Sequence, residues 1–142
     1  MANILDALAQ YLVNNITVAK YGSYGLVLGQ NLFLGRLPAE APNASVLVQP
    51  YPGRAPSLTM GIEAIAIDNL KIQLLIRGEP EDYPDTYAWA DTIRTALASI
   101  VGTQVIDGIH ILRMAPLGTI SPMPYDDGNR PKFTINFEAN VQ

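Results

Sequence analysis

The hydrophobic pattern is most regular between residues 70 and 101, where a strand-like alternation gives way to a helical repeat. Every second residue of 70–77 is apolar, which predicts a strand with one buried face because successive strand side chains point to opposite sides. Its apolar positions are Leu70, Ile72, Leu74 and Ile76. In residues 84–101 the apolar positions recur at steps of four and three, which predicts an amphipathic helix. Its stripe consists of Trp89, Ile93, Leu97 and Ile100, with Ala90 and Val101 beside it. We expect the strand and the helix to pack through these faces.

The ends of this helix carry three sequence signals. Pro84 suits the first helical position, where its missing N–H costs no hydrogen bond. Asp85 in the first turn complements the helix dipole, and Gly102 is expected just past the last turn, where the backbone is often left-handed. Upstream of the central strand, Asp68 and Asn69 are expected to form a turn.

Weaker patterns predict the remaining elements. An apolar stripe that follows a suitable N-cap, Asn3, predicts a helix over residues 3–16. Residues 17–30 contain glycines without the spacing of a phosphate-binding loop, so we expect a bent connection there. Further strands are expected over residues 31–37, 45–49, 61–67, 109–114 and 133–141. The last one alternates, with Phe133, Ile135, Phe137, Ala139 and Val141 inward and Thr134, Asn136, Glu138 and Asn140 outward.

The order of these elements predicts the fold class. Residues 50–57 and 117–131 are rich in proline and are expected to be long loops. No repeat or linker divides the chain, so residues 1–142 are expected to form a single domain. The expected fold is α+β, with a mostly antiparallel, mixed β-sheet and two main helices packed on one face. The other face of the sheet is expected to be polar and uncharged, which suits either solvent or a neighbouring subunit.

Composition narrows the classes of partner. Only 15% of the residues are charged, and uncharged surface is easier to bury in a protein interface. The net charge of −4 argues against a protein that grips nucleic acid, although it suits a surface that nucleic acid slides past. The absence of cysteine excludes disulfides and thiolate metal sites. The opening residues do not resemble a signal peptide, and no apolar run reaches the ~18 residues that span a membrane. We therefore expect a protein that matures in a cytoplasm without membrane contact.

Candidate chemistry is sparse. His110 is the only histidine and lies within a predicted strand, with Asp107 on the preceding turn. One histidine without cysteine is too few ligands for a zinc site. Four carboxylates near the start of the main helix could serve acid–base chemistry if they lined a cleft. They are Glu79, Glu81, Asp82 and Asp85. We predict no catalytic, cofactor-binding or metal-binding residues, and a small enzyme or ligand-binding domain is kept as the less favoured alternative.

The two long loops are better candidates for a functional surface. Each combines tyrosine with arginine, which are residue types enriched in protein contacts. The sequence Asp126-Asp127-Gly128 lacks the register of a calcium loop and is predicted to be a tight turn. We predict that contacts with other subunits or partners involve Tyr51, Arg54, Tyr125, Asp126, Asp127 and Arg130.

Three segments of the chain together resemble the tail terminator family of tailed bacteriophages, also described as minor capsid or tail-to-head joining proteins. They are the amphipathic opening helix, the strand LKIQLLIRG at 70–78 with the helix that follows it, and the closing strand FTINFEANV at 133–141. The likeness spans nearly the full chain and rests on hydrophobic patterns. The loops at 50–56 and 119–131 match no motif of the family, so the resemblance assigns them no role.

This resemblance implies a structural, non-enzymatic virion protein that is assembled in the cytoplasm of a bacterial host. Its copies would form a hexameric ring on the head-proximal end of the tail tube, stop polymerisation and join the tube protein to a neck or connector protein. DNA would pass through the lumen without specific binding. A closed ring would also cover exposed sheet edges. The alternative in the same class is another neck component, such as a head-completion or stopper ring.

Overall fold

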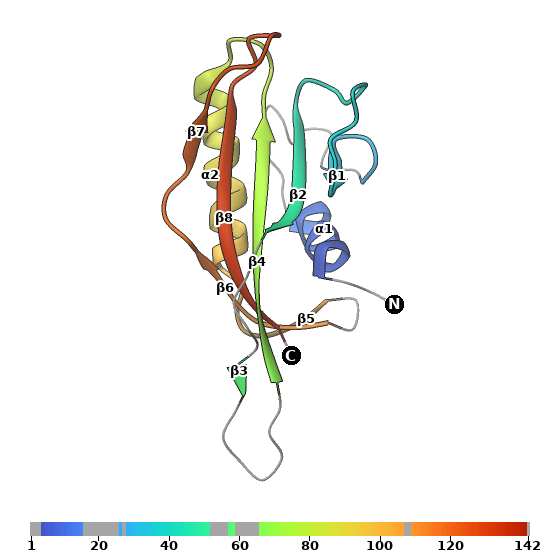
Figure 1. Cartoon of the computed structure of the whole chain (residues 1–142), viewed down its shortest axis with the longest axis vertical. Helices are drawn as coiled ribbons and strands as arrows, with labels where there is room; N and C mark the ends of the chain where they lie inside the picture. The colour runs from blue at the N-terminus through green and yellow to red at the C-terminus, as the bar shows by residue number, and fades with distance from the viewer. Residues whose placement is uncertain are drawn as a thin grey trace.

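The computed structural model describes residues 4–15, 26, 28–51, 57–58, 66–106 and 109–141. Two helices and eight strands lie in this part of the chain (Figure 1). The helices are α1 (Ile4–Asn15) and α2 (Tyr83–Ala98). The strands are β1 (Leu32–Leu34), β2 (Ser45–Tyr51), β3 (Ser57–Leu58), β4 (Ala66–Arg77), β5 (Val101–Ile106), β6 (Ile109–Pro116), β7 (Ser121–Met123) and β8 (Lys132–Val141).

The strands form one mixed, mostly antiparallel sheet. Its main path runs β1-β2-β4-β8-β6-β5, and β1–β2 is the parallel pair on this path. The two long strands β4 and β8 lie at the centre and pair antiparallel from Asp68 with Val141 to Arg77 with Lys132. β3 pairs with β4 beyond the end of β2, and β7 pairs with β8 beyond the end of β6. The predicted α+β fold is confirmed.

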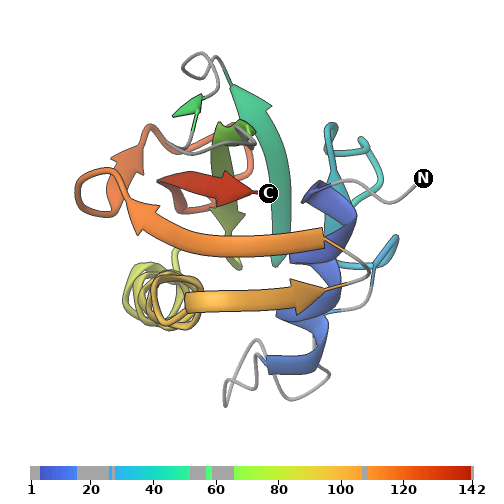
Figure 2. The same ribbon diagram turned by 90° about the horizontal axis from the view of Figure 1, so that it is seen from below.

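One face of the sheet builds the core. The register aligns Val46, Ile76 and Phe133 in one row and Val48, Leu74 and Ile135 in the next. All six side chains are buried, which confirms the predicted inward faces of the two central strands. Both helices pack into the same cluster, α2 through Trp89, Ala90, Ile93 and Leu97 and α1 through Leu8, Ala9 and Leu12. Figure 2 shows the sheet curling around this core, with α2 and α1 at opposite sides of it.

Polar residues line the opposite face in the register that the alternation predicts. Gln49, Gln73 and Asn136 are aligned across β2, β4 and β8 and are partly buried. The Gln49 Nε2 donates to Gln73 Oε1 at 2.9 Å, and the Gln73 Nε2 donates to Asn136 Oδ1 at 3.1 Å. We call this row the amide ladder. Thr134 lies on the same face but is only 8% exposed, because Leu75 and Ser121 flank it on the neighbouring strands.

Several predicted boundaries are wrong around the central strand. Asp68 and Asn69 do not form a turn, because β4 begins at Ala66 and both residues pair with β8. The proline-rich segment 50–57 gives its first two residues to β2 and its last to β3. Pro50 is tolerated because β1 pairs only as far as Val48, so β2 is an edge strand from there on. The predicted strand at 31–37 is only three residues long.

The ends of α2 also differ from prediction. The N-cap is Asp82, so Pro84 is the second helical residue and not the first. The helix ends at Ala98 with Ser99 as a right-handed C-cap, and not before Gly102. Val101 and Gly102 instead open β5, a strand that the sequence did not predict. Its backbone finds partners on β6, and a register shift in this pairing lies between Val101 and Gln104.

The long loop predicted at 117–131 contains β7, a three-residue strand with an exposed surface. Its Pro122 pairs with Phe133 of β8 from the edge of the sheet, where the missing N–H is tolerated. No helix in the described part of the chain is long and apolar enough to cross a membrane.

Candidate functional site

The predicted contact residues that the structure describes lie at the two ends of the sheet. Tyr51 is the last residue of β2, and its side chain, like all of Arg54, lies outside the described residues. Tyr125, Asp126, Asp127 and Arg130 lie in the β7–β8 connection, near the start of β2. Since β2 spans six residue steps, the two groups are about 20 Å apart. The end of β2 at Tyr51 is therefore far from the described contact residues of the second proline-rich loop.

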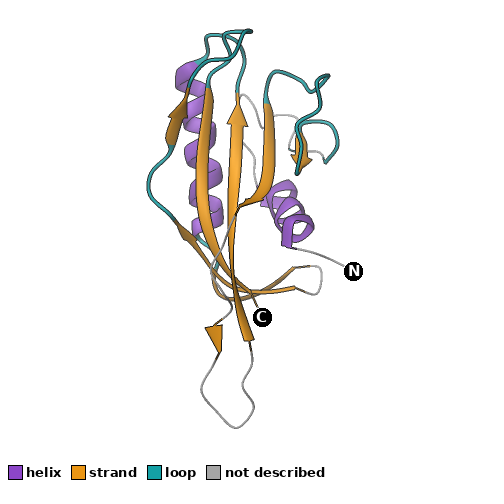
Figure 3. Cartoon of the chain, in the orientation of Figure 1, coloured by secondary structure: helices purple, strands orange, loops and turns teal. Residues whose placement is uncertain are grey.

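Three connections meet at the end of the sheet that carries Tyr125. They are residues 35–44 between β1 and β2, residues 78–82 between β4 and α2, and residues 124–131 between β7 and β8. Figure 3 shows these teal loops gathered beyond the ends of β2, β4 and β8. We refer to them as the loop cluster. Two backbone hydrogen bonds join the second loop to the third, from Gly78 N to Pro131 O at 3.0 Å and from Glu81 N to Asn129 O at 2.9 Å.

The third loop is held by Asp126 and Arg130. The Asp126 Oδ1 accepts hydrogen bonds from Gly128 N at 3.0 Å and Arg130 N at 3.2 Å, which is the turn predicted from Asp-Gly. The Asp126 Oδ2 accepts from Arg130 Nε at 2.9 Å and also lies 2.9 Å from Arg130 NH2. These two contacts with one carboxylate oxygen fix the arginine side chain as well as the turn. Asp126 and Arg130 are thus used to shape the loop, whereas Tyr125 and Asp127 are exposed.

Arg77 ties the first loop to the end of β4. Its side chain is only 8% exposed, and its Nε donates to Asn43 O at 3.0 Å. Its NH2 donates to Pro42 O at 2.8 Å and to Ala41 O at 3.4 Å. A planar guanidinium can satisfy several carbonyls at once, which a lysine ammonium on a flexible stem does less well. From the sequence we did not predict that Arg77 binds loop carbonyls, although an arginine at the end of an apolar strand could have indicated it.

Asn43 joins all three loops. Its Oδ1 accepts from Arg130 NH1 at 3.3 Å, and its Nδ2 donates to Glu79 Oε2 at 3.1 Å. The same residue accepts from Arg77 through its backbone carbonyl. Five polar residues, four from the three loops and Arg77 from the end of β4, therefore form one network, and the loop cluster is a single ordered surface.

The charges within this network affect one another. Burial lowers the pKa of Arg77, and the nearby Arg130 lowers it further, whereas Asp126 opposes the change. Burial alone would raise the pKa of Asp126, but hydrogen bonds from Arg130 N and Gly128 N and the charge of Arg130 hold that pKa below its usual value. The Asp126 carboxyl is therefore ionised near neutral pH. The outer surface of the cluster is acidic, with exposed carboxylates on Glu79, Glu81, Asp85 and Asp127.

Close packing fixes the second loop against α2. A Cβ atom added to Gly78 would lie 1.7 Å from Thr86 Oγ1 and 2.8 Å from Thr86 Cβ. Thr86 is fully buried, and its hydroxyl donates to Asp82 O at the start of the helix. Only glycine therefore allows β4 to end this close to α2.

The alternative of an enzyme receives no geometric support. The carboxylates Glu79, Glu81, Asp82 and Asp85 lie in or beside the loop cluster, at the end of the sheet where Arg77 pairs with Lys132. His110 lies near the opposite end, since the residue after it pairs with Val141. The His110 side chain and all of Asp107 are outside the described residues. Across the described part of the chain, no group of three His, Cys, Asp or Glu side chains is arranged to hold a metal ion.

Comparison with known proteins identifies the family. The family model described as bacteriophage tail terminator protein matches residues 12–142. The chain belongs to the bacteriophage tail terminator family. This membership confirms the resemblance inferred from the three hydrophobic segments. It makes the protein a structural component of a virion and not an enzyme.

A solved structure shows a similar fold for this tail terminator family member. A chain described as "Virion of native gene transfer agent (GTA) particle" aligns with a TM-score of 0.60 and 16% sequence identity. The alignment covers 97% of this chain and 93% of that chain. At this identity the likeness concerns the fold alone. No curated protein sequence matches this chain with significance.

Proposed function

We propose that this protein forms a hexameric ring on the head-proximal end of a completed tail tube, stops its polymerisation and offers a surface to the neck. The observation that carries the proposal is the family match over residues 12–142. The low charged fraction of 15% supports it, because weakly charged surface is easily buried between subunits. A closed ring would also satisfy sheet edges that a single copy leaves open.

The loop cluster supplies a rigid surface for one of these contacts. Binding costs less entropy when a surface is already ordered, and the network of Arg77, Asn43, Arg130 and Asp126 orders this one. Tyr125 and Asp127 are exposed, whereas Asp126 and Arg130 are partly buried, so we propose that Tyr125 and Asp127 touch the tube protein or the neck protein. Asp126 and Arg130 would act by holding the loop. Tyr51, at the end of β2, and Arg54, outside the described residues, remain proposed contacts.

We further propose that DNA passes through the lumen of the ring without specific binding. The net charge of −4 supports this, since DNA binding without sequence preference depends on lysine and arginine. The protein would be assembled in the cytoplasm of the bacterial host and would leave the cell within the virion.

Electron microscopy of particles that lack the protein tests the function. A terminator predicts tails of irregular or excessive length that carry no heads, and restoration of normal particles by the wild-type gene. Tails of normal, fixed length with heads attached would contradict the proposal. Tails of normal length that are detached from heads would instead favour another neck component, and a gold label on the protein would then show its position.

Single substitutions in the loop cluster test whether Tyr125 and Asp127 contact a partner. Tyr125→Ala and Asp127→Ala should reduce the yield of joined particles while the thermal unfolding midpoint stays close to that of wild type. Thr95→Ala is the control, because Thr95 is exposed on α2 away from the cluster. Normal particle yield from both loop variants would show that this loop is not a contact.

A further inference from the structure

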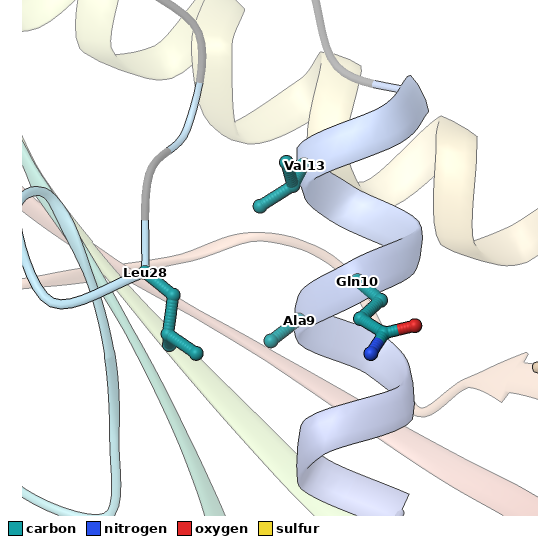
Figure 4. A pocket seen from close by; sticks show the side chains of 4 residues that line it. All are labelled: Ala9, Gln10, Val13 and Leu28. Carbon is teal, nitrogen blue, oxygen red and sulfur yellow. The ribbon is translucent and has the colours of Figure 1, made fainter. Parts of the chain in front are cut away.

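Seven large hydrophobic side chains are exposed among those that the structure describes. Two of them, Tyr83 and Tyr87, are neighbours on α2 and form an exposed aromatic pair. Two others belong to a groove of about 240 Å³ beside α1 (Figure 4). The described residues that line this groove are Ala9, Gln10, Val13 and Leu28. None of them is charged, so the groove does not indicate the chemistry of a partner, whereas the surroundings of the tyrosine pair do.

The tyrosine pair is an ordered surface. The rings of Tyr83 and Tyr87 are nearly parallel, with 15° between their planes and 6.4 Å between their centroids. Both rings meet the buried ring of Phe133 edge-on, with centroids 5.0 and 5.5 Å away. The two tyrosines are nevertheless 42% and 45% exposed. Contiguous exposed rings mark contact surfaces more often than scattered ones do, and rings already held by a buried neighbour lose little entropy when a partner covers them.

The surface continues onto the sheet at Pro122. This residue lies opposite Phe133 in the pairing of β7 with β8, so the two side chains are on the same face of the sheet. Pro122 is exposed, and no strand other than β8 pairs with β7 in the described part of the chain. A proline offers no N–H to a further strand, so a partner would contact this edge through side chains. We call Tyr83, Tyr87 and Pro122 the tyrosine face.

The net negative charge of the chain is concentrated around these tyrosines. Residues 79–94 contain five carboxylates and one cation, Arg94, and therefore carry a net charge of −4. The five carboxylates are Glu79, Glu81, Asp82, Asp85 and Asp91. The whole chain also has a net charge of −4, so the remaining residues balance, with eight acidic and eight basic side chains. All of the five except Asp82 are exposed.

Two cations lie near the tyrosine face, and both are placed by contacts of their own. The Arg94 NH2 donates to Gly118 O at 3.0 Å, so part of this guanidinium already has a backbone partner. Lys132 precedes Phe133 on β8, and alternate strand residues point to opposite sides. Its side chain therefore lies on the other face of the sheet, in register with Arg77. The tyrosine face is thus bordered by more negative than positive charge.

This combination selects the chemistry of a partner. A negative border repels the phosphates of nucleic acid and the head groups of anionic lipids, so the partner is a protein. Exposed aromatic faces attract cations, and the planar guanidinium of arginine stacks on such rings better than the ammonium of lysine does. Tyrosine and arginine are also the residue types that contribute most to protein contacts.

We propose that the tyrosine face docks an arginine-bearing surface of another virion protein. Guanidinium groups of the partner stack on the rings of Tyr83 and Tyr87 and pair with carboxylates such as that of Asp91. This inference rests on the proposed function only for the source of the partner, which is the tail tube or the neck. It adds a contact beside that of Tyr125 and Asp127, and it specifies the charge of the partner.

Binding to purified particles tests the docking. The probes are tail tubes and tailless heads from strains that lack this protein, and cosedimentation of the full chain measures binding to each. Wild type should bind at least one of them. Tyr87→Leu keeps apolar cover over Phe133 but removes the ring, and Asp91→Lys reverses a charge. Each should weaken binding at least about 10-fold. The loss caused by Asp91→Lys should shrink as salt is raised, because salt screens exposed charges.

Matched variants separate this contact from general damage. Tyr87→Phe keeps the ring, and Gln30→Lys adds a positive charge to an exposed residue near β1, so both should bind as wild type does. Circular dichroism melts check that each variant is folded. If Tyr87→Leu or Asp91→Lys binds as tightly as wild type, or if the loss from Asp91→Lys is independent of salt, the proposed docking is wrong. Wild type that binds neither particle would overturn the proposed function itself.

Photocrosslinking identifies the occupant without weakening the contact. The photoreactive residue p-benzoylphenylalanine in place of Tyr87 keeps an aromatic ring at this position. In joined particles, mass spectrometry should find the crosslink within a few residues of an arginine in a tube or neck protein. A crosslink to a second copy of this chain, a crosslink far from any arginine, or no crosslink would each overturn the proposal. Thr92, exposed on another row of α2, is the control position and should crosslink less.

Discussion

Glu81 and Asn129 are two left-handed residues joined by a backbone hydrogen bond across the loop cluster. Their φ angles are 59° and 54°, and Glu81 N donates to Asn129 O at 2.9 Å. A left-handed backbone costs a residue other than glycine about 1–2 kcal/mol. Residues keep this conformation only when the surrounding contacts hold them in it, and they often occur at functional surfaces. The network around Asp126 and Arg130 supplies those contacts here.

Asn129 should tolerate glycine but not a β-branched residue. Asparagine accepts the left-handed region better than most residues, whereas valine is a clear outlier there. Asn129→Val should lower the free energy of unfolding by about 1–2 kcal/mol relative to Asn129→Gly, because both lose the same amide group and only valine is strained. Urea unfolding of the two variants measures this difference. Equal stability would mean that residue 129 is not held in the left-handed conformation.

Gly78→Ala should be strongly destabilising. The new methyl group would overlap Thr86, which is buried and cannot move away. Overpacking of this kind typically costs about 1–3 kcal/mol, and we expect the upper part of that range because the contact would be only 1.7 Å. Thermal or urea unfolding of the purified variant measures the loss.

Two further variants control for this result. Gly128→Ala should cost less, since the nearest atom to its Cβ is the movable Arg130 Nε at 3.1 Å. Thr86→Ala in the Gly78→Ala background should recover part of the lost stability, because it removes the closest atom. If the two substitutions are instead additive, Gly78 and Thr86 are not in contact.

Hydrophobic periodicity was sufficient to predict the central part of the fold. Ile72, Leu74 and Ile76 are buried on one face as predicted, and so are Phe133, Ile135 and Phe137. These strands are long and have one buried face, so a shift by one residue would expose the whole apolar set. The pattern was therefore sufficient to predict that these segments are strands and which of their side chains face the core.

Elements that depend on distant partners could not be predicted in this way. β5 begins at Val101, inside the periodic run that was assigned to the helix, and it exists because β6 supplies its hydrogen bonds. β7 contains a proline and is held by β8 alone among the described strands. In the candidate site, the turn at Asp126–Gly128 was predictable from local chemistry. The roles of Arg77 and Asn43 depend on loops that are far apart in sequence.

Leu74→Asp should prevent folding. Leu74 is completely buried between Val48 and Ile135, and an unpaired carboxylate there would be left without solvent. Gln73→Glu is the control, because Gln73 is adjacent in sequence, lies on the partly exposed opposite face and loses only its hydrogen bond to Asn136 in the amide ladder. Circular dichroism should show a cooperative melt for the control and none for Leu74→Asp. A near-wild-type melt of Leu74→Asp would mean that the two faces are reversed.

Arg77→Met should destabilise the protein by about 2–3 kcal/mol. The methionine fills similar space but leaves the carbonyls of Pro42 and Asn43 without their charged donor in a largely buried site. Arg77→Lys should recover only part of this loss, because one ammonium cannot reproduce the guanidinium fork. Arg36→Met is the control, since Arg36 is exposed in the same loop. If urea unfolding shows that Arg77→Met loses no more stability than Arg36→Met, Arg77 does not hold the loop as assigned.

The stability provided by Asp126 should depend on pH. Its folded-state pKa lies below the usual value, so the ionised form is favoured by folding. The stabilisation is therefore fully present above the unfolded-state pKa of about 3.9 and is lost as the pH falls through the lower, folded-state pKa. At neutral pH we expect Asp126→Asn to be less stable than wild type by ~1 kcal/mol or less, because the ion pair is partly exposed.

Unfolding midpoints of wild type and Asp126→Asn, measured from pH 7 down to the acid limit of folding, check this dependence. The difference between the two proteins should stay constant above about pH 4 and shrink below it, as the wild-type carboxyl becomes protonated. Asp127→Asn is the control, because Asp127 is adjacent and exposed, and its difference from wild type should stay small throughout. A difference for Asp126→Asn that grows as the pH falls would mean that folding raises the pKa of this carboxyl, and the pairing with Arg130 would then be wrong.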